Sequence, residues 1–435
     1  MSKTLFNFNN INKLILFYLI YIFLISIISL LLSHLYILNN SVILDNDLNI
    51  IIERIPFFWG PLTSNIYKDF SFTSEGPGFI FYLKKLPLNA LFLAIIFKIS
   101  KNIYIFMLIK NIISSSLIFF ITYFFTKNNK KNYLLFLFLL SGFFIVPYNT
   151  SVIFTYVYAD HLTSFLIPLL FLSLVSEYKK NYYLIGILIF TLYFIKPSMF
   201  FICMGIPFVL IFLEYKKKSF LEFVPFVFLL TAILLWGFYG LAKTGKFPFG
   251  KNLLSNNSHD FIAIANNDFI KNYPYVTVDT AQMLIVNDII NSNIFNSEWE
   301  YYDAFNKVNK KYLENNISEY LSSIPVKIKF IFFYIYRDNV QPSEFKIIGN
   351  KIRFSNLWNK FSLNLSLLIT LFILLKNFKN IFNFKLEIYY LTLVVLNLIP
   401  LIYAWATNKH LVALYITSNL YLALKFLSKR KAFSN

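Results

Sequence analysis

The sequence predicts an all-α polytopic membrane protein with about ten transmembrane helices, amphipathic surface helices and a helical segment outside the membrane. Of the 435 residues, 57% are hydrophobic and only 14% are charged, and the mean hydropathy is +0.60. Soluble globular domains do not have this balance. Long apolar runs recur along the chain, and basic residues gather at their ends. These observations together indicate a chain that crosses a membrane many times.

The basic clusters set the expected orientation, because cytoplasmic loops of membrane proteins carry an excess of Lys and Arg. Placing every cluster in the cytoplasm puts both ends of the chain there too. The clusters lie at residues 127–131, 179–180, 216–218, 376–385 and 429–431. The expected spans are 14–38, 101–125, 133–148, 160–176, 182–197, 198–213, 219–242, 360–376, 387–403 and 410–427. The first run is too long for a signal-peptide core and is expected to remain as an uncleaved span.

Two segments are expected outside the membrane, at residues 39–100 and 243–359. Each contains an apolar stretch that is too short or too broken to span, "LPLNALFLAIIFKIS" in the first and "IPVKIKFIFFYIYRD" in the second. Amphipathic helices lying at the membrane surface have this character. The chain therefore divides into a transmembrane core (1–242), an outside helical segment (243–359) and C-terminal transmembrane helices (360–435).

The second outside segment contains a helix-start signal. "SEWE", from Ser297 to Glu300, is a capping box, in which a hydroxyl and a carboxylate accept hydrogen bonds from free backbone N–H groups. Aromatic and aliphatic residues follow at near-helical spacing: Trp299, Tyr302, Phe305, Tyr312 and Leu313. This pattern predicts a small helical module that rests on the membrane domain.

Composition also argues against several classes of function. The net charge of +19 suggests nucleic acid in a soluble protein, but here the basic residues flank apolar runs, so no nucleic-acid partner is expected. The single cysteine, Cys203, gives no disulfide framework. The four histidines have no metal-ligand spacing, so no metal site is expected.

Acidic residues are few, which makes their positions informative. Asp45 and Asp47 follow the first span, and Glu75 lies later in the same outside segment. Asp160 stands at the mouth of a span, where a carboxylate costs free energy unless it is paired or solvated. The simpler interpretation is that Asp45 and Asp47 are solvated loop residues and that Asp160 caps a helix.

The stretch "FTSEGPGFIFYL", Phe72 to Leu83, combines Glu75 with a Gly-Pro-Gly sequence. Gly-Pro-Gly before an apolar run predicts a turn followed by a helix start. We expect this turn to aim Glu75 into a cavity, and we expect Phe79 to Leu83 to bury in the membrane interface.

Lys196 in "FIKPSMFF" is a cation between two apolar runs on the expected outer side. Its simplest role is to snorkel to lipid headgroups. The alternative is contact with the phosphate of a lipid-linked substrate. The Pro that follows it predicts a break between two helices.

The order of these features resembles that of the GT-C glycosyltransferases, and most closely the protein O-mannosyltransferase and lipid A aminoarabinose transferase type. Asp45, then Gly60, then Glu75 in "EGPGFIFYL" with Tyr82, reproduce the order of that family's first outside segment. Asp160 in "YADHLTSFLIPLL" and Lys196 match its second-loop acid and its Lys-containing turn.

The sequence also departs from the family pattern in two places. Gly76 stands where the aminoarabinose type has a basic residue. Near the C-terminus, Lys409 and His410 stand where the family often has an Arg-Tyr pair. The resemblance covers residues 10–240, and beyond them only the general layout agrees.

The resemblance implies an inverting transfer of a sugar from a polyprenyl-phosphate donor to a glycan, lipid or protein acceptor. It assigns the general base to Asp45, with Asp47 as the neighbouring candidate, and implies that Glu75 and Asp160 orient substrate groups or hold the partners of Asp45. The donor would be contacted by Lys84, Lys85, Lys196, Arg337 and Tyr82. A polyprenyl phosphate is itself a good leaving group, so no cofactor is expected. The implied location is a bacterial inner membrane, with the active site on the outer side.

Two other functions fit the layout. O-antigen polymerases and ligases have a similar number of spans, but they would place essential Arg and His residues in a late outside loop. A flippase or transporter would place polar residues midway along its spans. The early position of the acids favours a glycosyltransferase over both.

Overall fold

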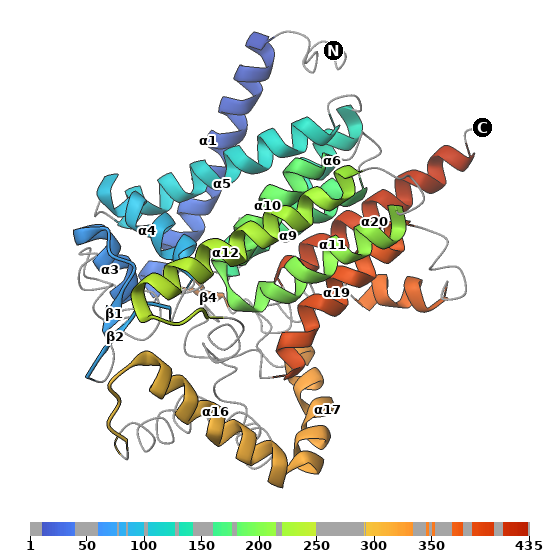
Figure 1. Cartoon of the computed structure of the whole chain (residues 1–435). Coiled ribbons are helices and arrows are strands. Elements are labelled where there is room, and N and C mark those ends of the chain that lie inside the picture. Colours follow the sequence, from blue (N-terminus) through green and yellow to red (C-terminus); the bar gives the residue numbers. More distant parts are fainter. Residues whose placement is uncertain are drawn as a thin grey trace.

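The computed structural model describes residues 11–39, 60–75, 78–83, 86–99, 103–126, 130–141, 160–175, 181–214, 220–248, 291, 293–333, 345–347, 350–352, 368–376, 385–403 and 412–433. Within these ranges the chain is all-α, as predicted, apart from two short hairpins (Figure 1). The first hairpin pairs β1 (Ser74–Glu75) with β2 (Ile80–Phe81). The second pairs β3 (Phe345–Ile347) with β4 (Asn350–Ile352).

Each range expected as a span contains a helix in its described part, and further helices lie in the two segments between those ranges. The helices of the described chain are α1 (Ile11–Asn39), α3 (Gly60–Asp69), α4 (Pro87–Ile99), α5 (Ile103–Thr126), α6 (Lys130–Ser141), α9 (Asp160–Val175), α10 (Tyr182–Ile195), α11 (Phe200–Glu214), α12 (Val224–Thr244), α16 (Glu298–Asn315), α17 (Ile317–Phe333), α19 (Lys385–Tyr403) and α20 (Val412–Phe433). Residues 368–376 are also helical, and the 3₁₀ turns η3 (Pro197–Met199) and η5 (Phe220–Phe223) precede α11 and α12. Among the described residues, one continuous helix, Phe220–Thr244, is long and apolar enough to cross a membrane.

Local chemistry explains where the central helices begin and end. The Asn181 side chain caps α10 by accepting a hydrogen bond from the Leu184 N–H at 3.1 Å. α10 ends at Ile195, and the next residue, Lys196, has an extended backbone because a proline follows it, which confirms the predicted break. α12 ends at Thr244 and is capped by Gly245, where φ is +71° and the N–H donates to the Leu241 carbonyl at 2.9 Å.

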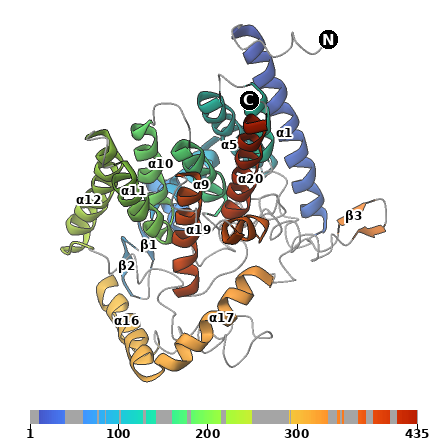
Figure 2. The same ribbon diagram turned by 90° about the vertical axis from the view of Figure 1, so that its right-hand side faces the viewer.

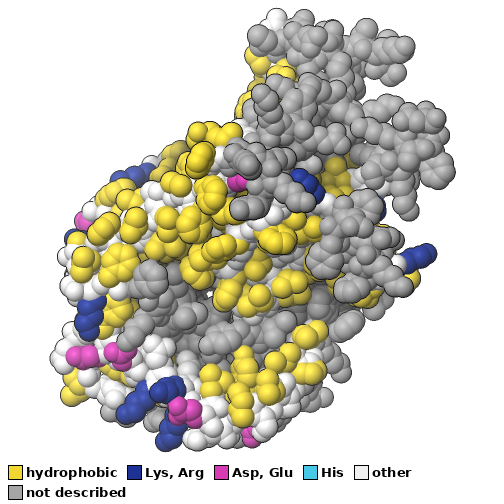
Figure 3. All heavy atoms as spheres, turned by 45° about the vertical axis from the view of Figure 1, so that its right-hand side comes forward, with side chains coloured by type: hydrophobic (Ala, Val, Ile, Leu, Met, Phe, Trp, Pro, Cys, Tyr) yellow, Lys and Arg dark blue, Asp and Glu magenta, His cyan; other side chains and the backbone are white. Residues whose placement is uncertain are grey.

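The surface of this bundle is unusually apolar. Figure 3 shows hydrophobic side chains in a broad band across the described part of one face, with many of the charged side chains toward the lower end. On α12, Val227, Leu234 and Phe238 are each more than 40% exposed, and on α1 the same is true of Leu19 and Phe23. Apolar surface of this extent marks contact with lipid or with another apolar body.

Gly186 lets α10 and α12 pack closely. A Cβ atom at this position would lie 2.5 Å from Cδ2 of Phe228 on α12. We expect Gly186→Ala to destabilise the fold by about 1–3 kcal/mol, because the Phe228 ring would have to leave its packed position. The unfolding midpoint in detergent measures this loss. Adding Phe228→Leu should recover part of it, and an unchanged midpoint in Gly186→Ala would contradict the close approach.

Candidate functional site

The stretch around Glu75 forms a β-hairpin. Ser74 pairs with Phe81 and Glu75 with Ile80, and Gly78 in the connecting turn has φ of +84°, a conformation that favours glycine. The predicted turn is therefore confirmed. The predicted helix start immediately after it is wrong, because the chain pairs back as β2 and α4 begins only at Pro87.

The helical module begins at the predicted capping box. The Ser297 hydroxyl accepts a hydrogen bond from the Glu300 N–H at 3.4 Å. The Glu300 carboxylate accepts from the N–H of Asn296 at 2.8 Å, one residue earlier than a standard capping box uses. Trp299 and Tyr302, on the predicted apolar face of α16, are buried.

Aromatic contacts join the hairpin to α16. The Phe81 ring lies 5.1 Å from the Tyr301 ring and 6.3 Å from the Tyr302 ring, measured between centroids. Phe79 also contacts Tyr301, at 6.0 Å. Phe81 and Leu83 are both 1% exposed. The expected burial of this stretch in the membrane interface is therefore wrong for Phe81 and Leu83, because protein covers them.

Glu298 lies at this junction as a buried carboxyl group. Its Oε2 atom accepts hydrogen bonds from the N–H groups of Tyr82 at 3.2 Å and Leu83 at 3.1 Å, and from the Tyr302 hydroxyl at 3.3 Å. Among the described residues Oε1 has no hydrogen-bond partner. Burial raises the pKa of Glu298, and the three hydrogen bonds oppose that shift only in part.

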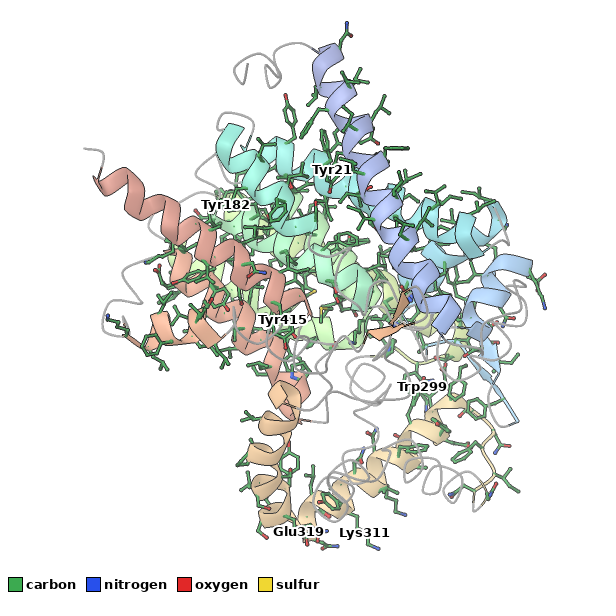
Figure 4. The ribbon with its side chains drawn as sticks, turned by 180° about the vertical axis from the view of Figure 1, so that it is seen from behind. Tyr21, Tyr182, Trp299, Lys311, Glu319 and Tyr415 are labelled. Atoms are coloured by element: carbon green, nitrogen blue, oxygen red, sulfur yellow. The ribbon has the colours of Figure 1, made fainter. Side chains whose placement is uncertain are left out.

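The C-terminal part of α12 completes the surroundings of Glu298. The Tyr239 hydroxyl donates to the Phe72 carbonyl at 3.2 Å and lies within electrostatic reach of Glu298. Just beyond α12, Lys246 places its ammonium group 5.8 Å from the centroid of the Trp299 ring. Figure 4 shows Trp299 near the start of α16, beneath the helical bundle.

Asp160 and Lys196 stand at the same end of the bundle. α9 and α10 pack against each other and are joined only by residues 176–181, so they run antiparallel. The start of α9 at Asp160 therefore lies beside the end of α10, which Lys196 follows. Lys196 is half-buried, and its carbonyl accepts the Met199 N–H at 3.0 Å.

The hairpin belongs to that same end. α12 runs parallel to α10, because Gly186 faces Phe228 and, farther along both helices, Phe194 contacts Trp236. Near the end of α12, a Cβ atom at Gly240 would lie 3.2 Å from Leu83. Figure 2 shows α16 and α17 at the end opposite to the start of α1 and the end of α20.

The structure describes some of the predicted site residues with their side chains and others by their backbones alone, and the rest lie outside the described residues. Tyr82 and Lys196 are described with their side chains, and both lie at the end of the bundle that carries the hairpin. Glu75 and Asp160 are placed there by their backbones alone. The remaining candidates lie outside the described residues: Asp45, Asp47, Lys84, Lys85 and Arg337. Within the described chain, no group of three His, Cys, Asp or Glu side chains is positioned to hold a metal ion.

Glu298 was missed by sequence reasoning, although the sequence contains a signal for it. The buried face of α16 includes Glu298, Tyr302, Phe305, Asn309 and Tyr312, a sequence of four- and three-residue steps. An acid on an apolar stripe must find a buried partner or remain protonated. The capping box predicts roles for Ser297 and Glu300, on either side of Glu298, and none for Glu298 itself.

Comparisons of the chain with protein-family models, with curated proteins and with solved structures found no match.

The pKa shift of Glu298 predicts a pH-dependent stability. Because its pKa is higher in the folded than in the unfolded chain, its favourable contribution is complete below the ordinary value of 4.5 and is lost as the pH rises through the folded-state pKa. Glu298→Gln has no proton to lose. We expect it to gain stability over wild type progressively as the pH is raised, measured by unfolding midpoints from about pH 4 to pH 8. A difference that does not change with pH would contradict this expectation.

Proposed function

We propose that the protein is a GT-C-type membrane glycosyltransferase that moves a sugar from a polyprenyl-phosphate donor to a glycan, lipid or protein acceptor. One observation carries the proposal: the elements bearing Glu75, Tyr82, Asp160 and Lys196 lie at the same end of the helical bundle. The hairpin region with Glu75 and Tyr82, the start of α9 with Asp160 and the end of α10 with Lys196 come from three separate parts of the sequence. Their position at the same end of the bundle supports a shared site, as the resemblance to the GT-C family requires.

We further propose about ten spans, with the site on the outer side of a bacterial inner membrane. The exposed apolar faces of α1 and α12 support contact with lipid. Both the start of α1 and the end of α20 lie away from α16 (Figure 2), which fits two cytoplasmic termini and an outside module. The basic clusters follow the same assignment.

The proposed reaction is a single displacement. The acceptor hydroxyl attacks the anomeric carbon, the bond from that carbon to the phosphate oxygen breaks, and the hydroxyl proton passes to the Asp45 carboxylate. The polyprenyl phosphate leaves with the bonding electrons, and the sugar inverts. Lys196, with Lys84, Lys85 or Arg337, would stabilise the negative charge on the leaving phosphate.

Reconstitution tests the proposal and separates it from its rivals. The purified protein in lipid vesicles receives a radiolabelled sugar on a polyprenyl monophosphate, together with envelope glycan, lipid and protein fractions as acceptors. We expect label in one acceptor fraction. Transfer only from oligosaccharides on a polyprenyl diphosphate would favour a polymerase or ligase. Movement of the donor across the bilayer without transfer would favour a flippase.

A further inference from the structure

We propose that Glu298 is a positioning residue, which clasps the end of the β1–β2 hairpin to α16 and so fixes Tyr82 at the end of the bundle that carries the candidate site. The catalytic consequence rests on the proposed function, whereas the clasp itself does not. It joins two outside segments that are 215 residues apart in the sequence.

The clasp is built from directional hydrogen bonds to one oxygen atom. The consecutive N–H groups of Tyr82 and Leu83 both point at Oε2 of Glu298, at 3.2 and 3.1 Å, and the Tyr302 hydroxyl donates to the same atom. Glu298 is 2% exposed and Leu83 is 1% exposed. Removing the acceptor would therefore take hydrogen bonds from donors at a buried position, which is more costly than losing a surface hydrogen bond.

Aromatic packing alone would not fix the position of Tyr82. Rings such as Phe81 and Tyr301 can slide across each other at small cost, whereas two adjacent N–H groups bonded to one oxygen set both register and direction. Phe81 and Leu83 are buried while Tyr82 between them is partly exposed, so the side chains alternate as they do along a strand. Fixing the two N–H groups therefore also fixes the face of this strand-like segment on which the Tyr82 side chain lies.

A second contact keeps α16 over this end of the bundle. Lys246, two residues after the end of α12, lies against the Trp299 ring next to Glu298. The Tyr239 hydroxyl on α12 lies within electrostatic reach of both Glu298 and Tyr82. The clasp thus stands where three elements meet: the hairpin, α12 and α16.

A matched pair of variants isolates the acceptor oxygen. Glu298→Gln keeps an amide oxygen in place of Oε2, whereas Glu298→Met keeps the shape and removes every acceptor. Hydrogen exchange of the Tyr82 and Leu83 amides, resolved by fragmentation mass spectrometry, is the readout. We expect exchange about 10- to 100-fold faster in Glu298→Met and near wild type in Glu298→Gln. Glu300→Gln, two residues farther along α16 and exposed, is the control and should leave both amides unchanged.

The wild-type protein provides a test that does not depend on a variant folding. If its Tyr82 and Leu83 amides exchange at the rate of unprotected loop amides, the clasp is overturned. Equal exchange in folded Glu298→Met and Glu298→Gln would overturn it as well.

Kinetics then test the positioning role. With the polyprenyl-phosphate sugar as donor, we expect Glu298→Met to lower kcat with a smaller effect on the KM for the donor, and Glu298→Gln to restore kcat. Loss of kcat in both variants despite protected amides would overturn the positioning role and leave the clasp. If the wild type shows no transfer, the proposed function fails while the exchange result still decides whether the clasp exists.

Discussion

Asp45→Asn is expected to lower the rate of sugar transfer by about 10²- to 10⁴-fold, the contribution of a positioned general base. Asn has nearly the same size as Asp and can still accept a hydrogen bond from the acceptor hydroxyl. It cannot take up the proton as the oxygen attacks. We therefore expect kcat to fall while the KM for the polyprenyl-phosphate donor changes little, because the proposal assigns contact with the donor to other residues.

Asp47→Asn is the matched control, since it removes the same charge two residues away. It should retain most of the activity. Asp160→Asn, assigned to substrate orientation, should raise KM more than it lowers kcat. Activity lost in Asp47→Asn and kept in Asp45→Asn would move the base to Asp47. Full activity in Asp45→Asn, Asp47→Asn and Asp160→Asn alike would contradict the proposed site.

The positions of the helices could be read from the sequence because local signals determine them. The apolar run of α10 is bounded by an Asn cap and by the Lys196–Pro197 step, and the observed helix, Tyr182–Ile195, ends where that step predicts. The capping box likewise predicted the start of α16. Such signals act within one or two helical turns, and they do not depend on how the rest of the chain folds.

The junction between the β1–β2 hairpin and α16 could not be read in the same way. The apolar residues from Ile80 to Leu83 suit either a strand or the first turn of a helix, and pairing with Ser74 and Glu75 decides between them. The partner of Glu298 lies more than two hundred residues away, so no spacing rule connects them. The sequence thus predicts a candidate site as an ordered set of acids, whereas the junction at Glu298 depends on contacts that only the fold supplies.

Lys425→Met is expected to cause the largest loss of stability, roughly 3–5 kcal/mol. Lys425 on α20 forms an ion pair with Glu387 in the first turn of α19, and it donates a hydrogen bond to Oε1 of that carboxylate. The Glu387 side chain is 3% exposed and that of Lys425 is 23% exposed. Removing the cation would leave a buried carboxylate uncompensated, and breaking one side of a buried pair costs more than the pair itself contributes.

A double variant and a surface pair test this explanation. Lys425→Met combined with Glu387→Gln removes both charges and should recover much of the loss, because no uncompensated charge remains. Lys310 and Glu314 form an exposed pair on α16 at 3.7 Å, with side chains 78% and 60% exposed. Since water screens such a pair, Lys310→Met should change the unfolding midpoint in detergent very little. Equal midpoints for Lys425→Met and Lys310→Met would show that the Glu387–Lys425 pair is not a buried one. If the double variant recovers no stability, the loss comes from packing around Lys425 and not from its charge.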